Sequence, residues 1–123
     1  MKLHLADARN GHLFTAYGPG FLAVNGQRYA QSLLVFPDRP PLPWTIGDFA
    51  SLAPEELKPL LENGPEIIVF GTGARQLLPG PGLLQALAGS GTGFEVMTTA
   101  AGCRTFNILA GEGRRVLAAM LLP

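Results

Sequence analysis

The chain has 123 residues, 47% of them hydrophobic, which suits one compact core and predicts a single domain over residues 1–123. Nine Lys and Arg residues balance nine Asp and Glu residues, so no overall charge draws the chain toward nucleic acid or an anionic membrane surface. We therefore expect no nucleic-acid partner. No apolar run approaches the roughly 18 residues of a membrane-spanning helix, so we also expect no membrane insertion.

The first third of the chain predicts β-structure. Its aromatic and aliphatic runs are cut by turn residues, and an Asn-Gly pair such as Asn25-Gly26 is the strongest local sign of a tight hairpin. The unbroken apolar run at 33–36 indicates burial on both faces. We expect a strand at about 14–17 and then an antiparallel hairpin of 21–24 with 27–29, continuing through 33–36.

The next segment, PDRPPLPW, contains four prolines between residues 37 and 43. Fixed φ angles and missing N–H groups exclude a helix or a central strand there. We expect an extended connection, with Trp44 anchored on the core.

Strands and helices alternate in the second half. Pro54 suits a first helical position and Gly64 a stop, which predicts a helix that Pro59 shortens or kinks. The last apolar run is ambiguous, because its Leu, Ala and Met residues favour a helix, whereas its short length and the preceding Gly-Glu-Gly break favour a strand; we choose strand. This alternation implies βαβ units with parallel pairing. The other expected elements are a central buried strand at 67–70, a helix at 81–88, a strand at 94–97, a helix within 98–113 and the last strand at 116–122.

The sequence Gly71-Thr72-Gly73 follows a buried strand, as a phosphate-binding loop would. It lacks the sixth-place glycine of the dinucleotide fingerprint, where Gln76 stands, and it lacks the Lys followed by Ser or Thr of a Walker loop. The PGPG stretch at 79–82 also interrupts any helix that begins at the loop. Converging N–H groups of the two glycines, with Arg75 nearby, can still hold a carboxylate or phosphate oxygen. The alternative is a tight turn at the end of a strand.

The third expected helix places Cys103, Arg104 and Asn107 on neighbouring positions, with Thr98 or Thr99 as its N-cap. If the strand before it runs parallel to the strand ending at Gly71, this helix begins at the sheet edge where ligands of α/β folds collect. We therefore expect the glycine turn and the helix start to share one rim.

Few residues suit catalysis or metal binding. The one cysteine, Cys103, has no base beside it, because His4 and His12 lie in the N-terminal tract, and a small buried filler is the better interpretation. The same three residues form no metal-binding pattern, so we expect no metal and no cofactor. Cys103 has no disulfide partner, and the opening stretch MKLHLADARNGH has no apolar core of signal-peptide length, which together predict a reducing cytoplasm. Arg114-Arg115 forms a small basic spot, interpreted as a turn before a strand.

Three segments, FLAVNGQRYAQSLLVFPD, IIVFGTGARQ and FEVMTTAAGCRTFNILAGEGRRVLAAMLL, resemble domain-of-unknown-function family 498, the group with the Mth-938-like fold. Members of that family include the adipogenesis-associated domain proteins and a mitochondrial respiratory complex I assembly factor. The resemblance implies a three-layer α/β domain with a mixed central sheet, helices packed on it and a strand at 116–122. It implies no established enzymatic activity.

The resemblance also implies one region that holds the matching positions of the family. This chain departs from the family at Thr98, where relatives tend to carry an acidic residue, so a charged role of that position is not expected here. The matching positions are Gly71, Thr72, Gly73, Arg75, Cys103, Arg104, Thr105 and Asn107.

Three functional hypotheses follow. The leading one is a non-catalytic binding or assembly-factor domain that holds a protein partner through Arg75, Arg104 and Asn107 or through an apolar surface. The alternative is a small-molecule site or weak enzyme that binds an anionic ligand with the Gly71–Gly73 loop and Arg104. In the third, the loop and the helix are purely structural.

Overall fold

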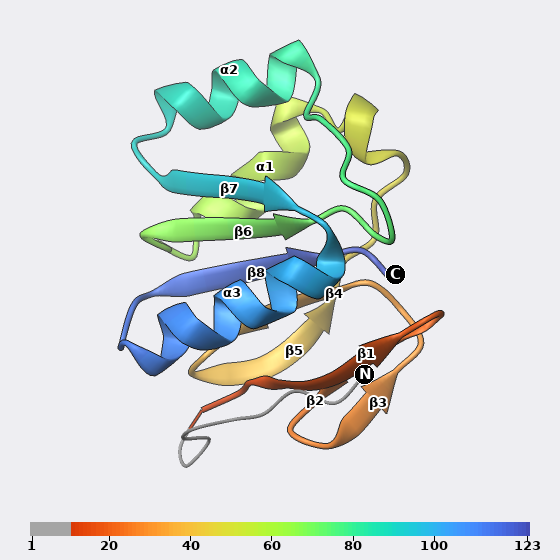
Figure 1. The fold of residues 1–123 in the computed structure, drawn as a ribbon. Helices are drawn as coiled ribbons and strands as arrows, with labels where there is room; N and C mark the ends of the chain where they lie inside the picture. Colours follow the sequence, from red (N-terminus) through yellow and green to blue (C-terminus); the bar gives the residue numbers. More distant parts are fainter. Residues whose placement is uncertain (1–10) are drawn as a thin grey trace.

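The computed structural model describes residues 11–123, which form an antiparallel sheet, a mixed sheet and three α-helices (Figure 1). Residues 1–10 lie outside the described residues, and with them His4 and the first part of the domain predicted over 1–123. The predicted α/β class, with a mixed sheet, packed helices and an antiparallel N-terminal hairpin, is confirmed.

The smaller sheet has the order β1-β2-β3 and is antiparallel throughout. Its strands are β1 (Phe14–Gly18), β2 (Phe21–Val24) and β3 (Gln27–Tyr29). Asn25 and Gly26, with φ angles of 49° and 84°, form the predicted hairpin turn.

The predicted continuation of this hairpin through residues 33–36 is wrong, because the chain changes sheets after Tyr29. Strand β4 (Leu33–Phe36) belongs to the larger sheet. Ser32 holds the crossing point, since its carbonyl accepts the Trp44 N–H at 2.8 Å and its hydroxyl accepts the Leu122 N–H at 3.1 Å. Sequence reasoning found the strand but not the sheet to which it belongs.

The larger sheet has the order β5-β4-β8-β6-β7 and is mixed. Strand β4 is antiparallel to both of its neighbours, whereas β6 is parallel to both β7 and β8, which confirms the predicted parallel pairing. Every residue of β8 is buried, because the strand is central and covered on both faces. The further strands are β5 (Arg39–Pro43), β6 (Ile67–Gly71), β7 (Gly93–Met97) and β8 (Val116–Met120).

Strand β5 corrects the expectation of an extended connection at residues 37–43. It is an edge strand, paired only with β4 in the described residues, and an edge position tolerates prolines because their missing N–H groups need no ladder partner. Trp44, which follows it, is buried as expected, with its ring centroid 6.2 Å from that of Phe70.

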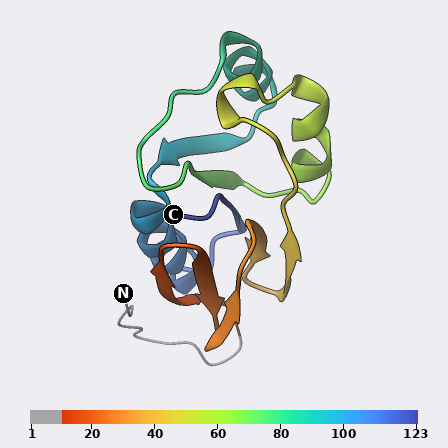
Figure 2. The same cartoon turned by 90° about the vertical axis from the view of Figure 1, so that its right-hand side faces the viewer.

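The helices and the small sheet cover the two faces of the large sheet (Figure 2). On one face, α1 (Pro54–Leu61) and α2 (Pro81–Gly89) bury apolar residues against Ile68, Phe70 and Leu117. On the other face, α3 (Thr99–Gly111) packs on β6 and β8, and β1 packs on α3, where the rings of Phe14 and Phe106 meet edge to face at 5.4 Å. Helix α1 begins at Pro54 and contains Pro59, as predicted.

Candidate functional site

The glycine turn after β6 and the start of α3 meet at the carboxyl edge of the large sheet, as expected. The Gly73 N–H donates to the Thr99 hydroxyl at 2.8 Å, and the Thr99 N–H donates to the Gly73 carbonyl at 3.0 Å. Strands β6 and β7 are parallel, so both reach this edge with their carboxyl ends. Two segments distant in sequence therefore share one rim.

The glycines at this rim allow α3 to pack directly on the sheet. A Cβ atom at Gly71 would lie 2.9 Å from the Thr99 Cα, which is closer than real Cβ contacts, and one at Gly102 would lie 2.7 Å from the Met120 Cε. Gly73 adopts a φ angle of 93°, which disfavours any residue with a Cβ. These positions thus have a packing reason for glycine before any ligand is considered.

The polar groups of the glycine turn already have partners inside the protein. The Thr72 side chain is buried; its hydroxyl donates to the Arg75 carbonyl at 2.7 Å and accepts the Leu77 N–H at 3.0 Å. The Thr72 N–H donates to the Met97 carbonyl at 2.8 Å, and the Gly73 N–H is held by Thr99. An anion bound by these N–H groups would have to displace partners that are already in place.

Cys103 lies in the core between α3 and the sheet and is fully buried. Burial raises the pKa of its thiol to about 12, with the Arg104 charge opposing the shift only in part. The thiol is therefore protonated at neutral pH and has no exposed surface for a substrate. This supports the interpretation of Cys103 as a small buried filler.

The remaining predicted residues on α3 contact different neighbours. The Asn107 side-chain amide forms a two-bond clamp on Phe14 of β1, accepting the Phe14 N–H at 2.9 Å and donating to the Phe14 carbonyl at 2.8 Å. Arg104 Nη1 donates to the Tyr17 hydroxyl at 2.7 Å, and the Thr105 hydroxyl lies 3.3 Å from the Met97 sulfur. Asn107 and Arg104 thus connect α3 to the small sheet.

A groove that sequence reasoning missed runs along the outer edge of β7, with a volume of about 450 Å³. Its wall is mostly apolar, and two of its leucines are exposed, Leu78 by 77% and Leu84 by 45%. The sequence did contain a sign of this groove, in the leucine pairs 77–78 and 83–84. In each pair the first leucine packs on the core, which leaves the second one facing outward. The lining residues are Leu78, Pro79, Leu84, Phe94, Glu95, Val96 and Met97.

The described part of the chain bears on two further classes of function, metal binding and membrane insertion. Within residues 11–123, no three His, Cys, Asp or Glu side chains lie close enough together to hold a metal ion. None of the helices in this part of the chain has both the length and the apolar character that crossing a membrane requires.

Comparison with known proteins adds the family. The family model described as "Protein of unknown function (DUF498/DUF598)" matches residues 14–121. The chain belongs to this family. Its fold is shared with solved structures, including a Bordetella parapertussis protein, with a TM-score of 0.84 and 36% identity over 95% of this chain and 100% of that one. A Bordetella pertussis protein described as a Mth938-like domain has a TM-score of 0.78 and 34% identity over 98% of this chain and 92% of that one.

Curated relatives of this DUF498 chain include longer proteins. The "NADH dehydrogenase [ubiquinone] 1 alpha subcomplex assembly factor 3" of Danio rerio is 33% identical over 119 residues, covering 95% of this chain and 68% of the relative. The protein of the same name from Xenopus tropicalis is 36% identical over 85% of this chain, which spans 56% of the relative's length. The chain thus spans between about half and two thirds of these two relatives.

The DUF498 fold brings some of the predicted residues together and separates others. Gly71, Thr72 and Gly73 meet the first turn of α3, and Thr98 caps that helix by accepting the Ala101 N–H at 3.3 Å. Arg75, whose side chain is exposed, lies in the loop toward α2, whereas Arg104 and Asn107 bond to β1. The contacts of these residues therefore point to more than one surface.

Proposed function

We propose that this DUF498 domain is a non-catalytic assembly-factor domain in the cytoplasm, and that a protein partner occupies the groove along β7. The observation that carries the proposal is the exposed apolar wall of this groove, formed around Leu78 and Leu84. The assembly role rests on the curated relatives, which are named as assembly factors. A buried free thiol at Cys103 agrees with a reducing compartment.

The apolar wall supports a partner because large apolar side chains gather in one concave place. Leu78 is exposed by 77%, and Leu84 stands across the groove from the β7 residues Phe94 and Val96. Contiguous exposed apolar surface on a folded domain commonly marks an interaction site. Covering it would bury leucine and phenylalanine side chains, which contribute about 25 cal/mol per Å² of apolar area removed from water.

The open edge of β7 adds the backbone groups that an extended partner segment would use. Among the described residues, β7 pairs only with β6. The Val96 carbonyl faces outward, where it accepts from the Gln76 side chain at 3.1 Å. Because backbone groups alternate sides along a strand, those of Phe94 face outward as well. A partner strand added here would displace the Gln76 side chain from the Val96 carbonyl, extend the sheet and place its side chains against the groove.

The predicted residues Arg75 and Arg104 form the rival surface for the same function. Both side chains are exposed, but Arg104 already donates to Tyr17, and neither arginine lines the apolar groove. The small-molecule alternative has less support, because the Thr72 and Gly73 N–H groups that an anion would need are engaged within the protein.

The test is affinity capture from a native lysate with matched leucine variants. Leu84→Glu and Leu78→Glu place a charge in the groove, and Leu42→Glu places one on β5, where Leu42 is 48% exposed. All three positions are exposed, so unfolding free energies should stay within about 0.5 kcal/mol of wild type. We expect specific partners to be lost by both groove variants and retained by the Leu42 variant.

Two outcomes would count against the proposal. Equal recovery of the same proteins by wild type and both groove variants would place the partner elsewhere, and parallel capture with Arg104→Ala and Arg75→Ala would then decide whether it is the rival surface. Capture of no specific protein by the wild-type chain would remove the binding role itself.

A further inference from the structure

A second pocket lies at the amino-terminal end of the parallel strands, where β6 and β8 begin and β4 turns into β5. Its volume is about 240 Å³, and it combines an apolar wall with three arginines. Phe36, Pro65 and Val116 belong to that wall. The arginines are Arg39, Arg114 and Arg115.

Helix endings place the arginines at this edge. Gly113, with a φ angle of 80°, lies two residues after the last residue of α3 and turns the chain away from the helix. The next residue, Arg114, donates its N–H back to the Leu109 carbonyl at 3.1 Å. This Schellman-type ending sends Arg114 and Arg115 directly to the start of β8. Gly64, with a φ angle of 69°, follows α1 in the same way. Two helix ends and a strand turn thus meet around one hollow.

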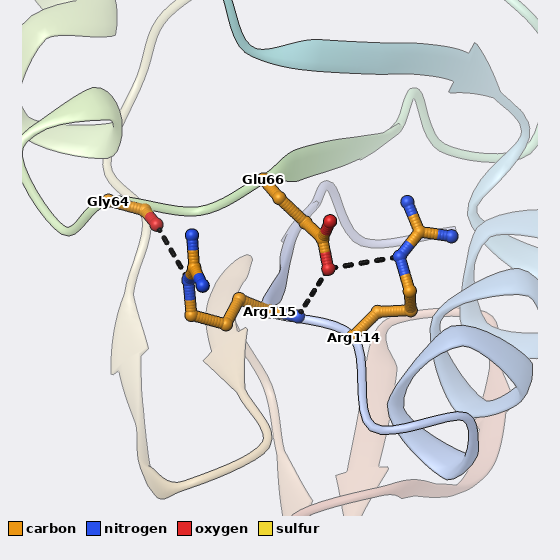
Figure 3. Close-up of polar contacts among 4 residues, drawn as sticks. All are labelled: Gly64, Glu66, Arg114 and Arg115. Atoms are coloured by element: carbon orange, nitrogen blue, oxygen red, sulfur yellow. Dashed lines mark hydrogen bonds and ion pairs between the residues drawn. The ribbon is translucent and has the colours of Figure 1, made fainter.

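Each of the two adjacent arginines is held by its Nε atom, which leaves its terminal nitrogens available. Arg114 Nε donates to Glu66 Oε1 at 2.9 Å, and Arg115 Nε donates to the Gly64 carbonyl at 3.2 Å (Figure 3). The Arg115 N–H donates to the same Glu66 oxygen at 3.1 Å. Among residues 11–123, the Nη atoms of Arg114 and Arg115 have no hydrogen-bond partner. Figure 3 shows the two guanidinium groups on opposite sides of the Glu66 carboxylate, with the Arg115 group beside Gly64, so they do not converge on one point.

Arg39 supplies the third guanidinium from the β4–β5 turn. Its carbon Cζ lies 4.3 Å from the centre of the Phe36 ring, and its Nη1 donates to the Asn63 side chain at 2.9 Å. Its Nε lies 3.5 Å from Asp38, whose side chain is 76% exposed. Stacking on Phe36 and the bond to Asn63 fix the plane of this group while leaving Nη2 without a partner in the described part of the chain.

The charge around the hollow is positive. Three arginines and one carboxylate, that of Asp38, line the pocket, and the Glu66 carboxylate is paired with Arg114 beside it, so positive charges outnumber negative ones. The hydrogen bond from Arg114 and that from the Arg115 backbone lower the pKa of Glu66, so this carboxylate stays ionised and occupied. Arginine forks bind carboxylate and phosphate oxygens with paired hydrogen bonds, a geometry that lysine lacks.

We propose that this arginine pocket binds one anionic group, a carboxylate or a phosphate, carried on a small apolar body. The free Nη atoms of Arg39 and Arg115, which are anchored beside the adjacent residues Asn63 and Gly64, would hold the anion. Phe36, Pro65 and Val116 would contact the apolar body. The volume, below the roughly 300 Å³ at which typical ligand sites begin, suits a single group rather than a nucleotide. This site is separate from the β7 groove and does not depend on it.

The test uses the whole chain labelled with ¹⁵N and two probes at constant ionic strength. Phenyl phosphate and phenylacetate share the apolar body and differ in the anion, and benzyl alcohol provides the body without a charge. We expect saturable shifts of the amide signals of residues 113–116 and of the arginine Nε signals with at least one anion, and none with benzyl alcohol. The stronger of the two anions identifies the phosphate or the carboxylate as the group recognised.

Arginine variants decide whether the binding is specific. Arg115→Gln and Arg39→Gln each remove charge-assisted hydrogen bonds and should raise the dissociation constant about tenfold or more. Arg75→Gln removes an exposed arginine outside the pocket and should leave it unchanged. Equal weakening in all three variants, or no saturable shift in the wild type, would overturn the proposal and leave the arginines with the sole role of compensating the carbonyl ends of α1 and α3. A thermal melt of each variant establishes that it is folded.

Discussion

The two ends of the parallel strands in this domain differ in how many of their polar groups are already hydrogen-bonded. At the carboxyl edge, the N–H groups and hydroxyls of Thr72, Gly73 and Thr99 are paired with one another or with neighbouring backbone. At the amino edge, Arg114 and Arg115 are anchored by Nε and keep their terminal nitrogens unpaired within the described residues. Open α/β sheets usually bind ligands at the carboxyl edge. In this domain the polar groups with free hydrogen-bonding capacity lie at the amino edge, which therefore suits a ligand better.

The two edges should respond differently to substitution. Substitutions at the closed carboxyl edge should cost stability, because they disturb packing and internal hydrogen bonds. Substitutions at the open amino edge should leave stability nearly unchanged and alter only binding. The following four experiments run from the largest expected effect to the smallest.

Gly71→Ala should be the most damaging of these changes. The added Cβ would lie 2.9 Å from the Thr99 Cα, and backbone cannot move aside as a flexible side chain can. We expect a loss of about 3 kcal/mol in unfolding free energy, the upper range for overpacking. Urea denaturation measures it. Gly111→Ala, at the last residue of α3 with open space around it, is the control and should be neutral or stabilising. Equal stabilities of the two variants would refute close packing at the rim.

Thr99→Val should remove about 2 kcal/mol while preserving the side-chain shape. The Thr99 hydroxyl accepts the Gly73 N–H at 2.8 Å and donates to the Leu121 carbonyl at 2.6 Å, and both groups would lose their partner in a buried place. The matched control is Thr105→Val on the same helix, whose hydroxyl hydrogen-bonds only to the Met97 sulfur among residues 11–123. A Thr99 variant as stable as the Thr105 variant would mean that the rim is not closed by this bond.

Cys103 should make the folded state sensitive to alkaline pH. Its pKa is raised to about 12 in the folded protein from 9.0 when exposed, so the stabilisation of the neutral thiol is complete below pH 9 and is lost as pH rises toward 12. The loss should be on the order of 1 kcal/mol by pH 10. Urea unfolding of wild type and Cys103→Ala at pH 7.5 and pH 10 isolates this residue. A stability difference that is independent of pH would contradict the buried thiol.

Arg114→Gln should have the smallest effect on stability, because its pair with Glu66 is exposed, with 42% and 40% of the two side chains accessible to solvent. The pKa of Glu66 is lowered, so the contribution of this pair is present above the usual pKa and disappears as pH falls through the lowered value. Thermal melts of wild type and variant should therefore differ slightly at pH 7 and by less at pH 3. A loss comparable to that of Thr99→Val would erase the contrast between the two edges.

Local signals were sufficient for most elements of the fold. The Asn25-Gly26 hairpin and the start of α1 at Pro54 were predicted, and the N-cap of α3 was narrowed to Thr98 or Thr99, of which Thr98 is the cap. Each of these features depends on residues adjacent in the chain. The parallel pairing of β6 and β8 followed from the alternation of strands and helices. The two errors, β5 as a connection and β3 as continuous with β4, concern which sheet a segment joins, and no local signal carries that information.

The candidate site was only partly accessible from sequence. The meeting of Gly73 with Thr99 was expected from topology, but the saturation of their polar groups depends on atoms contributed by three segments. Asn107 was assigned to a binding patch, although its amide is paired with Phe14 across the length of the chain. Of the arginine pocket, the sequence indicated only the small basic spot at Arg114 and Arg115, because Arg39 is remote from them in the sequence.

The amino-acid sequence by itself determined the α/β class and the elements of the second half, because these depend on periodicity, capping residues and composition. Only the tertiary structure decided which leucine of each pair faces the β7 groove, which glycines lie against backbone and which polar groups retain free hydrogen-bonding capacity. The physical reason is that packing and hydrogen bonding are satisfied between segments, so the partners of a residue are chosen by the fold and not by its neighbours in the chain.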